Sequence, residues 1–351
     1  MNRADIGSVA SEEVFVGVDV HRKSYSVCAL RQGVVALKAT VPAKPGKLVE
    51  LLCKRFPGQR VRTVYEAGFS GFVLHRVLDA AGIASIVVDP ASVEIAVNDR
   101  VKTDMRDSRR LAALLACGRL RGIRIPTVAE ETSRLIVRTR QQMVSARTRA
   151  GVQFKSRLHQ FGLIAVEDSR RVSDVFMQEK IAAVAEGPLR LSLEALYRSW
   201  LHFHGEVSRY DALLRSKKEQ GVEEKVYRQL PGVGPVTARM LATELGDLRR
   251  FGNERALFSF VGLTPTEYSS GESVRRGHIS RRGSPMIRWL VVEAAWRAIR
   301  VDKALSNFFM RVAQTAGKKR AIVAVARKML GKIRVCFRLE IPYEKDFGVA
   351  V

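Results

Sequence analysis

The sequence predicts an N-terminal α/β domain followed by two mainly helical segments. Three strand-like runs, separated by short polar or glycine breaks, predict an antiparallel meander. They are residues 14–20, 24–30 and 33–41. Helices and strands then alternate, which predicts crossover connections and parallel strands. These are a helix near 46–55, a strand at 61–65, a helix near 72–80 and a strand at 83–88. Three antiparallel strands followed by this alternation is the order of a ribonuclease H-like α/β sheet.

The remainder of the chain is predicted to be mainly α. Residues 104–220 contain few glycines, and between 101 and 160 there are 14 Lys/Arg against 4 Asp/Glu, which predicts a basic helical connector. A third segment, rich in glycine before its last helices, carries 17 Lys/Arg against 4 Asp/Glu over residues 271–340. We therefore expect three domains, at 1–125, 126–225 (coiled-coil-like) and 226–351.

The charge of the chain indicates a polyanionic partner. The 351 residues include 60 Lys and Arg against 35 Asp and Glu, a net charge of +25. No apolar run is long enough to span a membrane, so nucleic acid is the simpler partner. The first residues, MNRADIGSVASEE, lack the apolar core of a secretory signal, and we expect a cytoplasmic protein.

Four carboxylates stand where a ribonuclease H-like sheet would bring them together. Asp19 ends the first strand and Glu66 directly follows a later one. Asp104 and Asp107 are three residues apart at the start of a helix, on one face, although acidic residues there also stabilise the helix itself. Other carboxylates compete for the third and fourth positions, namely Asp89, Glu94 and Asp99.

Such a cluster would be repulsive unless divalent cations occupy it. Two Mg²⁺ (or Mn²⁺) ions held by oxygen ligands would polarise a scissile phosphate, which predicts phosphodiester cleavage or transfer. Other metal-binding patterns are weak. The pair His202 and His204 has no third ligand nearby, and the cysteines form no CxxC pair. The cysteines are Cys28, Cys53, Cys117 and Cys336.

The third segment contains two further candidate features. Gly232 and Gly234, in LPGVGPVTARMLA, have the form of a helix-hairpin-helix element whose amides would bind a nucleic-acid backbone, or of a tight turn between helices. Adjacent hydroxyls at Ser269 and Ser270 precede a run of cations that could hold a phosphate for a serine nucleophile, whereas a solvated turn is the ordinary alternative. The cations are Arg275, Arg276, Arg281, Arg282 and Arg288.

These motifs, in this order, resemble the DEDD-type insertion-sequence transposases called bridge recombinases. The resemblance covers nearly the whole chain. VGVDVHRKSYSV resembles the first aspartate strand of that family, VYEAGFSG its glutamate motif, and RVKTDMRDSRRLAALLACGRL its paired-aspartate helix. LPGVGPVTARMLATELGD and FVGLTPTEYSSGESVRRGHISRRGSPMIRWL resemble its C-terminal transposase domain.

The resemblance implies that Asp19, Glu66, Asp104 and Asp107 form a metal-binding DEDD set in a fold similar to RuvC-like Holliday-junction resolvases. It further implies that Ser270 is the catalytic serine, with Ser269 as its rival. A structured noncoding RNA would guide donor and target DNA, and active sites would be completed between protomers of a dimer or tetramer. Two departures are visible: Ser108 stands where alanine is usual, and the serine is doubled.

Three functions remain open from the sequence. The first is a recombinase that cuts and rejoins DNA strands through metal ions and a serine. The second is a junction-resolving nuclease that uses water, because the carboxylate site alone could hydrolyse phosphodiesters. The third is a nucleic-acid-binding protein without enzymatic activity. A covalent protein–DNA species distinguishes the first from the second, and metal-dependent cleavage excludes the third.

Overall fold

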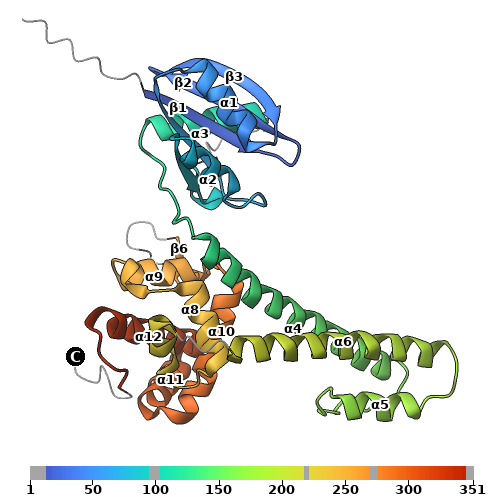
Figure 1. Ribbon diagram of the computed structural model, residues 1–351. Coiled ribbons are helices and arrows are strands. Elements are labelled where there is room, and N and C mark those ends of the chain that lie inside the picture. Colours follow the sequence, from blue (N-terminus) through green and yellow to red (C-terminus); the bar gives the residue numbers. More distant parts are fainter. Residues whose placement is uncertain (1–12, 95–102, 217–220, 269–272, 274, 345–351) are drawn as a thin grey trace, which may run out of the picture. The chain divides into compact units, whose positions relative to one another are not determined.

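The computed structural model describes residues 13–94, 103–216, 221–268, 273 and 275–344 (Figure 1). The chain divides into two compact units, one ending at Thr127 and the other beginning at Val128. The division into three domains stays a prediction. A search of the helices in these ranges found none that combines the length and the hydrophobicity of a membrane span.

The first unit is built on a five-stranded mixed sheet. Its strands are β1 (Glu13–Val20), β2 (Ser24–Arg31), β3 (Val34–Pro42), β4 (Arg60–Glu66) and β5 (Ala84–Val88). Their order is β3-β2-β1-β4-β5. The first three strands pair antiparallel, whereas β4 runs parallel to β1 and β5 parallel to β4. The predicted mixed sheet is confirmed, and its arrangement is consistent with a ribonuclease H-like domain.

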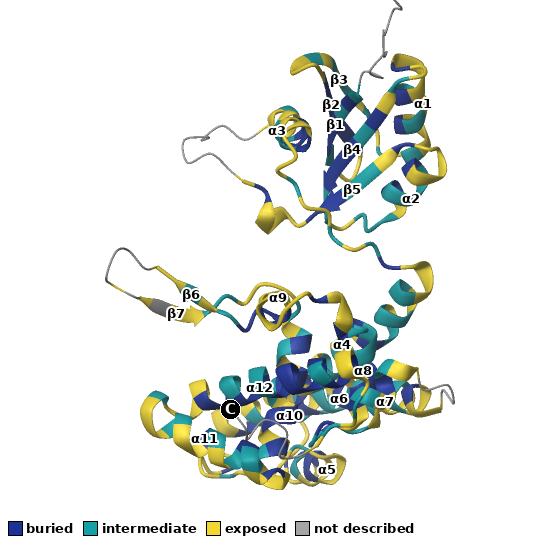
Figure 2. Cartoon of the chain, turned by 90° about the vertical axis from the view of Figure 1, so that its left-hand side faces the viewer, coloured by how far each residue is buried: buried dark blue, intermediate teal, exposed yellow. Residues whose placement is uncertain are grey.

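Helices cover both faces of this sheet (Figure 2). On one face lie α1 (Pro45–Arg55) and α2 (Val73–Ala80), whose leucines join a buried cluster with β1, β2 and β4. On the other face lies α3 (Asp104–Ala116), where Leu111 and Leu115 pack against Val64. A short 3-10 turn, η1 (Pro90–Ser92), follows β5.

A glycine permits the close packing of α3 on the sheet. A Cβ atom at Gly17, in the middle of β1, would collide with two backbone atoms of α3, the carbonyl oxygen of Ser108 and the amide nitrogen of Ala112. Because both obstacles belong to the main chain, neither can move without shifting the helix. The close approach therefore sets how far α3, with Asp104 at its start, lies from β1.

The second unit begins with a pair of long helices. They are α4 (Val128–Gln160) and α6 (Pro188–Ser216), which lie side by side, with α5 (Asp174–Ala182) between them in sequence (Figure 1). The buried residues of α6 recur at seven-residue intervals. They are Leu193, Trp200, Val207 and Leu214. This heptad spacing is typical of coiled-coil packing.

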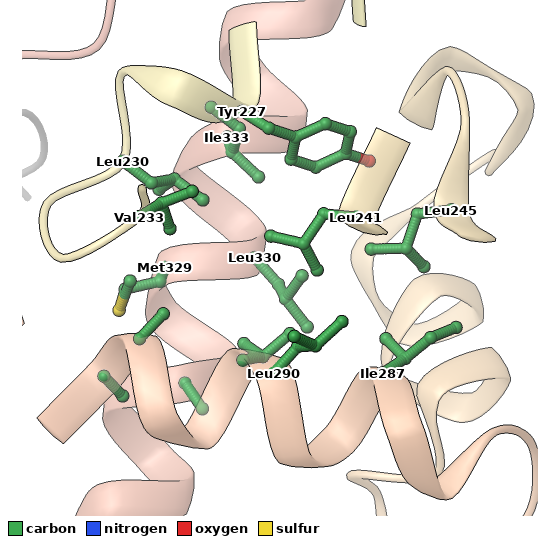
Figure 3. Packing of buried hydrophobic residues seen from close by; sticks show 14 of the residues in the cluster. Tyr227, Leu230, Val233, Leu241, Leu245, Ile287, Leu290, Met329, Leu330 and Ile333 are labelled. Carbon is green, nitrogen blue, oxygen red and sulfur yellow. The ribbon is translucent and has the colours of Figure 1, made fainter. Parts of the chain in front are cut away.

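The rest of the second unit is mainly helical, as predicted. Its helices are α7 (Val222–Arg228), α8 (Pro235–Leu245), α9 (Glu254–Val261), α10 (Pro285–Val301), α11 (Lys303–Ala316) and α12 (Lys318–Leu339), with a 3-10 turn η2 (Leu248–Arg250). Side chains of α7, α8, α10 and α12 meet in one apolar core (Figure 3). Because α12 is buried along much of its length, some of its cations are internal. Arg334, for example, donates to the carbonyl oxygens of Phe251 and Gly252, both at 2.8 Å.

The paired helices are fixed to this core at their base. Val137 of α4 and Leu214 of α6 belong to the same apolar cluster as α8 and α12. Arg138 of α4 also binds Glu244 of α8 through two hydrogen bonds, of 2.7 and 3.0 Å. The Glu244 side chain is only 3% exposed, so this bidentate pair is well shielded on its acidic side.

A small antiparallel hairpin leaves the helical core after α9. It consists of β6 (Pro265–Glu267) and β7 (Arg276–Ile279). At the base of the hairpin, residues 281–283 pack tightly on the end of α9, since a Cβ at Gly262 would collide with the carbonyl group of Arg282. The hairpin thus rises from a closely packed base.

The packing at Gly17 makes a testable prediction about stability. Gly17→Ala should lower the free energy of unfolding by at least about 1–3 kcal/mol, because an added methyl group must push backbone away. Urea denaturation of the full chain, followed by circular dichroism, measures this. Gly46→Ala is the matched control, since a Cβ at Gly46 meets nothing within 4 Å. Equal stability of the two variants would contradict the proposed constraint.

Candidate functional site

Asp19 and Glu66 lie at the ends of neighbouring parallel strands. The last pair of the β1–β4 ladder is Val18 with Tyr65, so the residues that follow each of them are neighbours. Side chains alternate between the two faces of a strand. Asp19 therefore shares a face with Gly17, and Glu66 shares one with Val64, which are the two strand positions packed beneath α3. Both predicted carboxylates are on the face that α3 covers.

The first turn of α3 carries the other two predicted carboxylates. The helix begins after Thr103, whose hydroxyl accepts a hydrogen bond of 3.4 Å from the amide of Arg106. Asp104 and Asp107 occupy the first turn, where negative charge interacts favourably with the helix dipole. Asp107 also forms an ion pair of 2.8 Å with Arg110. Helix stabilisation thus accounts for part of this acidic sequence.

A histidine that the sequence motifs did not single out links two of these carboxylates. The Nε2 atom of His21 lies 3.0 Å from Oδ2 of Asp19 and 3.2 Å from Oδ2 of Asp104. One ligand atom from each of the three residues falls within 4.8 Å of the others. The signal that could have found His21 is the spacing Asp-x-His at the end of the first strand, since it puts the imidazole two residues beyond Asp19.

The electrostatics of the cluster centre on Asp19. Partial burial raises the pKa of Asp19, and the negative charges of Asp104 and Asp107 raise it further, whereas His21 lowers it by charge and hydrogen bonding. The Asp19 side chain is 23% exposed, against 61% for Asp104. Burial and neighbouring negative charges disfavour the ionised form of this carboxylate, and a bound cation would favour it.

Two of the competing carboxylates have other partners. Asp89 caps η1 by accepting from the amide of Ala91 at 3.0 Å. Glu94 forms an ion pair of 2.6 Å with Arg119. Asp99 lies outside the described residues. The described alternatives are therefore engaged elsewhere, while Asp19 and Asp104 share a cluster.

Both candidate serines lie outside the described residues. Ser269 and Ser270 belong to the segment that joins β6 to β7 in sequence. Arg275 is exposed just before β7, and its carbonyl oxygen accepts from the amide of Tyr268 at 2.9 Å. Arg276 begins β7, although its side chain is not described. The roles of these four residues stay predictions.

The other predicted arginines fall into two kinds. Arg281 and Arg282 are exposed at the base of the hairpin. Arg288, by contrast, donates from Nη1 to three carbonyl oxygens, those of Val261, Arg282 and Gly283, at 2.9–3.2 Å. Burial and the charge of Arg281 lower the pKa of Arg288. Its contacts hold the loop to α9, which gives this residue a structural role.

The two glycines of the predicted turn have different surroundings. Gly232 has a φ of +79°, and a Cβ there would collide with Ala294 and Arg297 of α10, so this glycine serves turn geometry and helix packing. Gly234 is the N-cap of α8, and no atom lies within 4 Å of where its Cβ would stand. Of the two, Gly234 has the open surroundings that a phosphate contact needs.

The histidine pair forms no metal group in the described part of the chain. There, the one set of His, Cys, Asp and Glu close enough to hold an ion is Asp19, His21 and Asp104. His204 stacks on Trp200 with ring centroids 4.8 Å apart, while His202 contacts Phe203 edge-on.

Comparisons with protein-family models cover both units. Residues 16–162 match a model for DEDD-type IS110 transposases, described as Transposase. Residues 224–310 match the model described as Transposase IS116/IS110/IS902 family. The first match contains all four predicted carboxylates, and the second contains the glycine turn, both serines and the arginine run.

Relatives of similar length agree. The candidate transposase y4rJ of Sinorhizobium fredii is 30% identical, with 93% of this chain and 91% of the relative covered. The transposase for insertion sequence element IS1111A of Coxiella burnetii is 26% identical, with 72% and 71% covered. The transposase for IS1533 of Leptospira borgpetersenii is 25% identical, with 95% and 98% covered. The chain belongs to the IS110 family of transposases, enzymes that cut and rejoin DNA.

Proposed function

We propose that this transposase cuts and rejoins strands through a DEDD metal site and a serine nucleophile. The observation that carries the proposal is the convergence of Asp19 and Asp104, with His21 between them, at one edge of the sheet. Glu66 and Asp107 are positioned on the same face by β4 and by the first turn of α3. Asp19 and Asp104 thus meet from distant parts of the sequence, and Glu66 and Asp107 are proposed to complete the site.

The donor set of this site fits Mg²⁺ or Mn²⁺. Carboxylate oxygens are the ligands that these hard cations prefer. The pKa of Asp19 is raised mainly by burial and further by the charges of Asp104 and Asp107, and a bound cation would favour the ionised carboxylate. Asp19, Glu66, Asp104 and Asp107 would hold the metal. When bound, divalent ions polarise a scissile phosphate and stabilise the entering and leaving oxygens.

Other properties of the site come from how individual side chains are held and charged. Asp19 belongs to a strand and Asp104 to a capped helix, which supports a proposed site whose ligands are positioned by secondary structure. His21 can donate from Nε2 to either carboxylate and so offsets part of their mutual repulsion. Exposed Arg281 and Arg282, beside the hairpin, are suited to hold a phosphate group.

In the proposed strand transfer, the hydroxyl oxygen of Ser270 attacks phosphorus. A serine–phosphate bond forms as one phosphodiester P–O bond breaks, the serine proton is released, and the leaving oxygen takes up a proton. Rejoining reverses these changes with a new strand end. The bond count and charge balance without an external oxidant or energy source, because each step exchanges one phosphate ester for another.

The partners proposed are donor and target DNA, a structured noncoding RNA, and further copies of the chain in a dimer or tetramer. The net charge of +25 and the two basic concentrations in the sequence support a nucleic-acid partner. RNA guidance and sites shared between protomers are expectations from the family resemblance. The Gly234 end of α8 is the proposed backbone contact of a helix-hairpin-helix element.

Removing a carboxylate should separate binding from chemistry. Asp19→Asn and Glu66→Gln should each lower strand cleavage by at least about a hundredfold, because an amide cannot replace an anionic metal ligand. Cleavage of labelled DNA with and without Mg²⁺, alongside gel-shift titrations, measures both properties. Asp79→Asn, an exposed carboxylate of α2, is the control and should cleave normally. Wild-type cleavage by Asp19→Asn or Glu66→Gln would sink the site assignment.

Replacing the serines should locate the nucleophile. Ser270→Ala should bind DNA and RNA normally yet form no covalent protein–DNA adduct, because no hydroxyl remains to attack phosphorus. Ser269→Ala should form the adduct at a level near wild type. Denaturing gels of reactions with labelled DNA resolve the adduct from free strands.

Two other results of that experiment would change the proposal. An adduct that persists in Ser270→Ala and disappears in Ser269→Ala moves the nucleophile by one residue. An active wild-type enzyme without any adduct supports a water-using nuclease instead.

The exposed arginines at the hairpin base should make DNA binding depend on salt. Arg281→Gln and Arg282→Gln should each reduce the slope of log affinity against log salt by about 0.9, the value for one lost phosphate contact on duplex DNA. Arg209→Gln, whose side chain on α6 is 80% exposed, is the control and should leave the slope unchanged. Fluorescence anisotropy at several salt concentrations measures the slope, and equal slopes for all proteins would refute the contact.

A further inference from the structure

A cavity of about 640 Å³ lies among the helices of the second unit. Its walls come from α4, α6 and the segment before α5. Its volume falls within the range of small-molecule sites, roughly 300–1,000 Å³. Val152, Val172 and Trp200 supply apolar wall, and His204, stacked on Trp200, extends the aromatic surface. The cavity therefore has room and a surface suited to a flat, aromatic group.

Three cations surround this apolar wall: Arg147 and Lys155 of α4, and Arg171. Burial lowers the pKa of Arg147, and the positive charges of Arg140 and Arg171 lower it further. Asp211 acts in the opposite direction on the pKa of Arg147, but its carboxylate is paired with Arg140 at 2.8 Å. In the described part of the chain, neither Arg147 nor Arg171 forms an ion pair. An anion placed between them would remove their repulsion.

Hydrogen bonds hold residues 168–170, the segment just before Arg171, against α4. Nζ of Lys155 donates to the carbonyl oxygens of Asp168 and Arg170, at 2.6 and 3.1 Å. Arg170 binds the Asp168 carboxylate at 2.8 Å and lies over the ring of Phe176. Because these bonds fix the preceding residues, Arg171 is held in the lining of the cavity. The one acid in the lining, Asp174, accepts hydrogen bonds from Tyr197 and Gln178.

The close packing of α4 against Val172 and Trp200 depends on Gly151. A Cβ at Gly151 would come within 3.2 Å of Val172 Cγ1 and 3.4 Å of Trp200 Cδ1. Glycine at this position thus lets Val172 and the indole approach α4 together. The cavity thus has a closely packed apolar wall, a hydrogen-bonded segment at residues 168–170 and two arginines that form no ion pair among the described residues.

We propose that this cavity binds one unpaired nucleotide of a nucleic-acid strand, with its base against the aromatic wall and its phosphate between Arg147 and Arg171. Base and phosphate match the two halves of the lining, since aromatic rings stack on bases and arginines hold phosphates. A paired base stays in its duplex stack, so the site selects single-stranded regions. The proposal does not rest on the carboxylate or serine chemistry.

Binding assays with oligonucleotides of fixed length test the proposal. The full chain is titrated with a single strand of DNA about 20 nucleotides long, the same strand of RNA, and the DNA duplex. The variant that joins Arg147→Gln with Arg171→Gln should bind the preferred single strand at least about tenfold more weakly, with a salt slope lower by about 0.7. His204→Ala should weaken the same binding at least about fivefold, from lost stacking. The preferred strand identifies the partner as RNA or DNA.

A matched variant separates the cavity from general charge. Arg149→Gln removes an exposed cation of α4 that does not line the cavity, and it should change affinity less than about twofold. Duplex binding should weaken no more in the double variant than in Arg149→Gln. Single-strand affinity equal in the double variant and in Arg149→Gln would overturn the proposal. Loss of cleavage in Asp19→Asn leaves this result untouched, so the two proposals fail separately.

Discussion

The contact between β1 and α3 is the constraint on which the proposed active site depends. Gly17 allows the helix backbone to touch the strand, and this closeness brings Asp104 near Asp19. Carboxylates held so near one another repel, and the pKa of Asp19 is raised by burial first and then by the charges of Asp104 and Asp107. His21 offsets part of this repulsion through its contacts with both aspartates. The fold thus holds together charges that would otherwise separate, which is what a site for a cation needs.

Basic residues in the second unit serve two purposes that their abundance in the sequence does not distinguish. Arg288 and Arg334 point their guanidinium groups at backbone carbonyls, and Arg138 binds a shielded glutamate. Arg281 and Arg282 are exposed instead, and Arg147 faces a cavity. Arginine can do both because its five donors satisfy carbonyls inside a protein as well as phosphates outside it.

The sequence predicted the sheet well because local patterns determine it. Strand-forming runs, short breaks and the later alternation indicated the strands and their directions, and strand ends placed Asp19 and Glu66. Tertiary contacts were harder to foresee. No local pattern shows that Nη1 of Arg288 would donate to backbone carbonyls, or that Gly232 would pack on α10. His21 could have been predicted, because a residue two positions beyond Asp19 at the end of a strand places its ring beside the same site. The cavity draws on α4, α6 and a loop, and no short motif encodes such a combination.

The length of the paired helices has a geometric consequence for the cavity. Arg138 and Val137 fix α4 to the helical core, whereas Lys155, on the cavity, stands 17 residues further along than Arg138. At 1.5 Å per residue that separation is about 25 Å, so a tilt of roughly 10° at the base moves the cavity by about 4 Å. This displacement is about as long as the N···O distance up to which two charged groups form a salt bridge. A rotation of that size where the helices meet the core would therefore be enough to make or break a contact with a strand bound in the cavity as proposed.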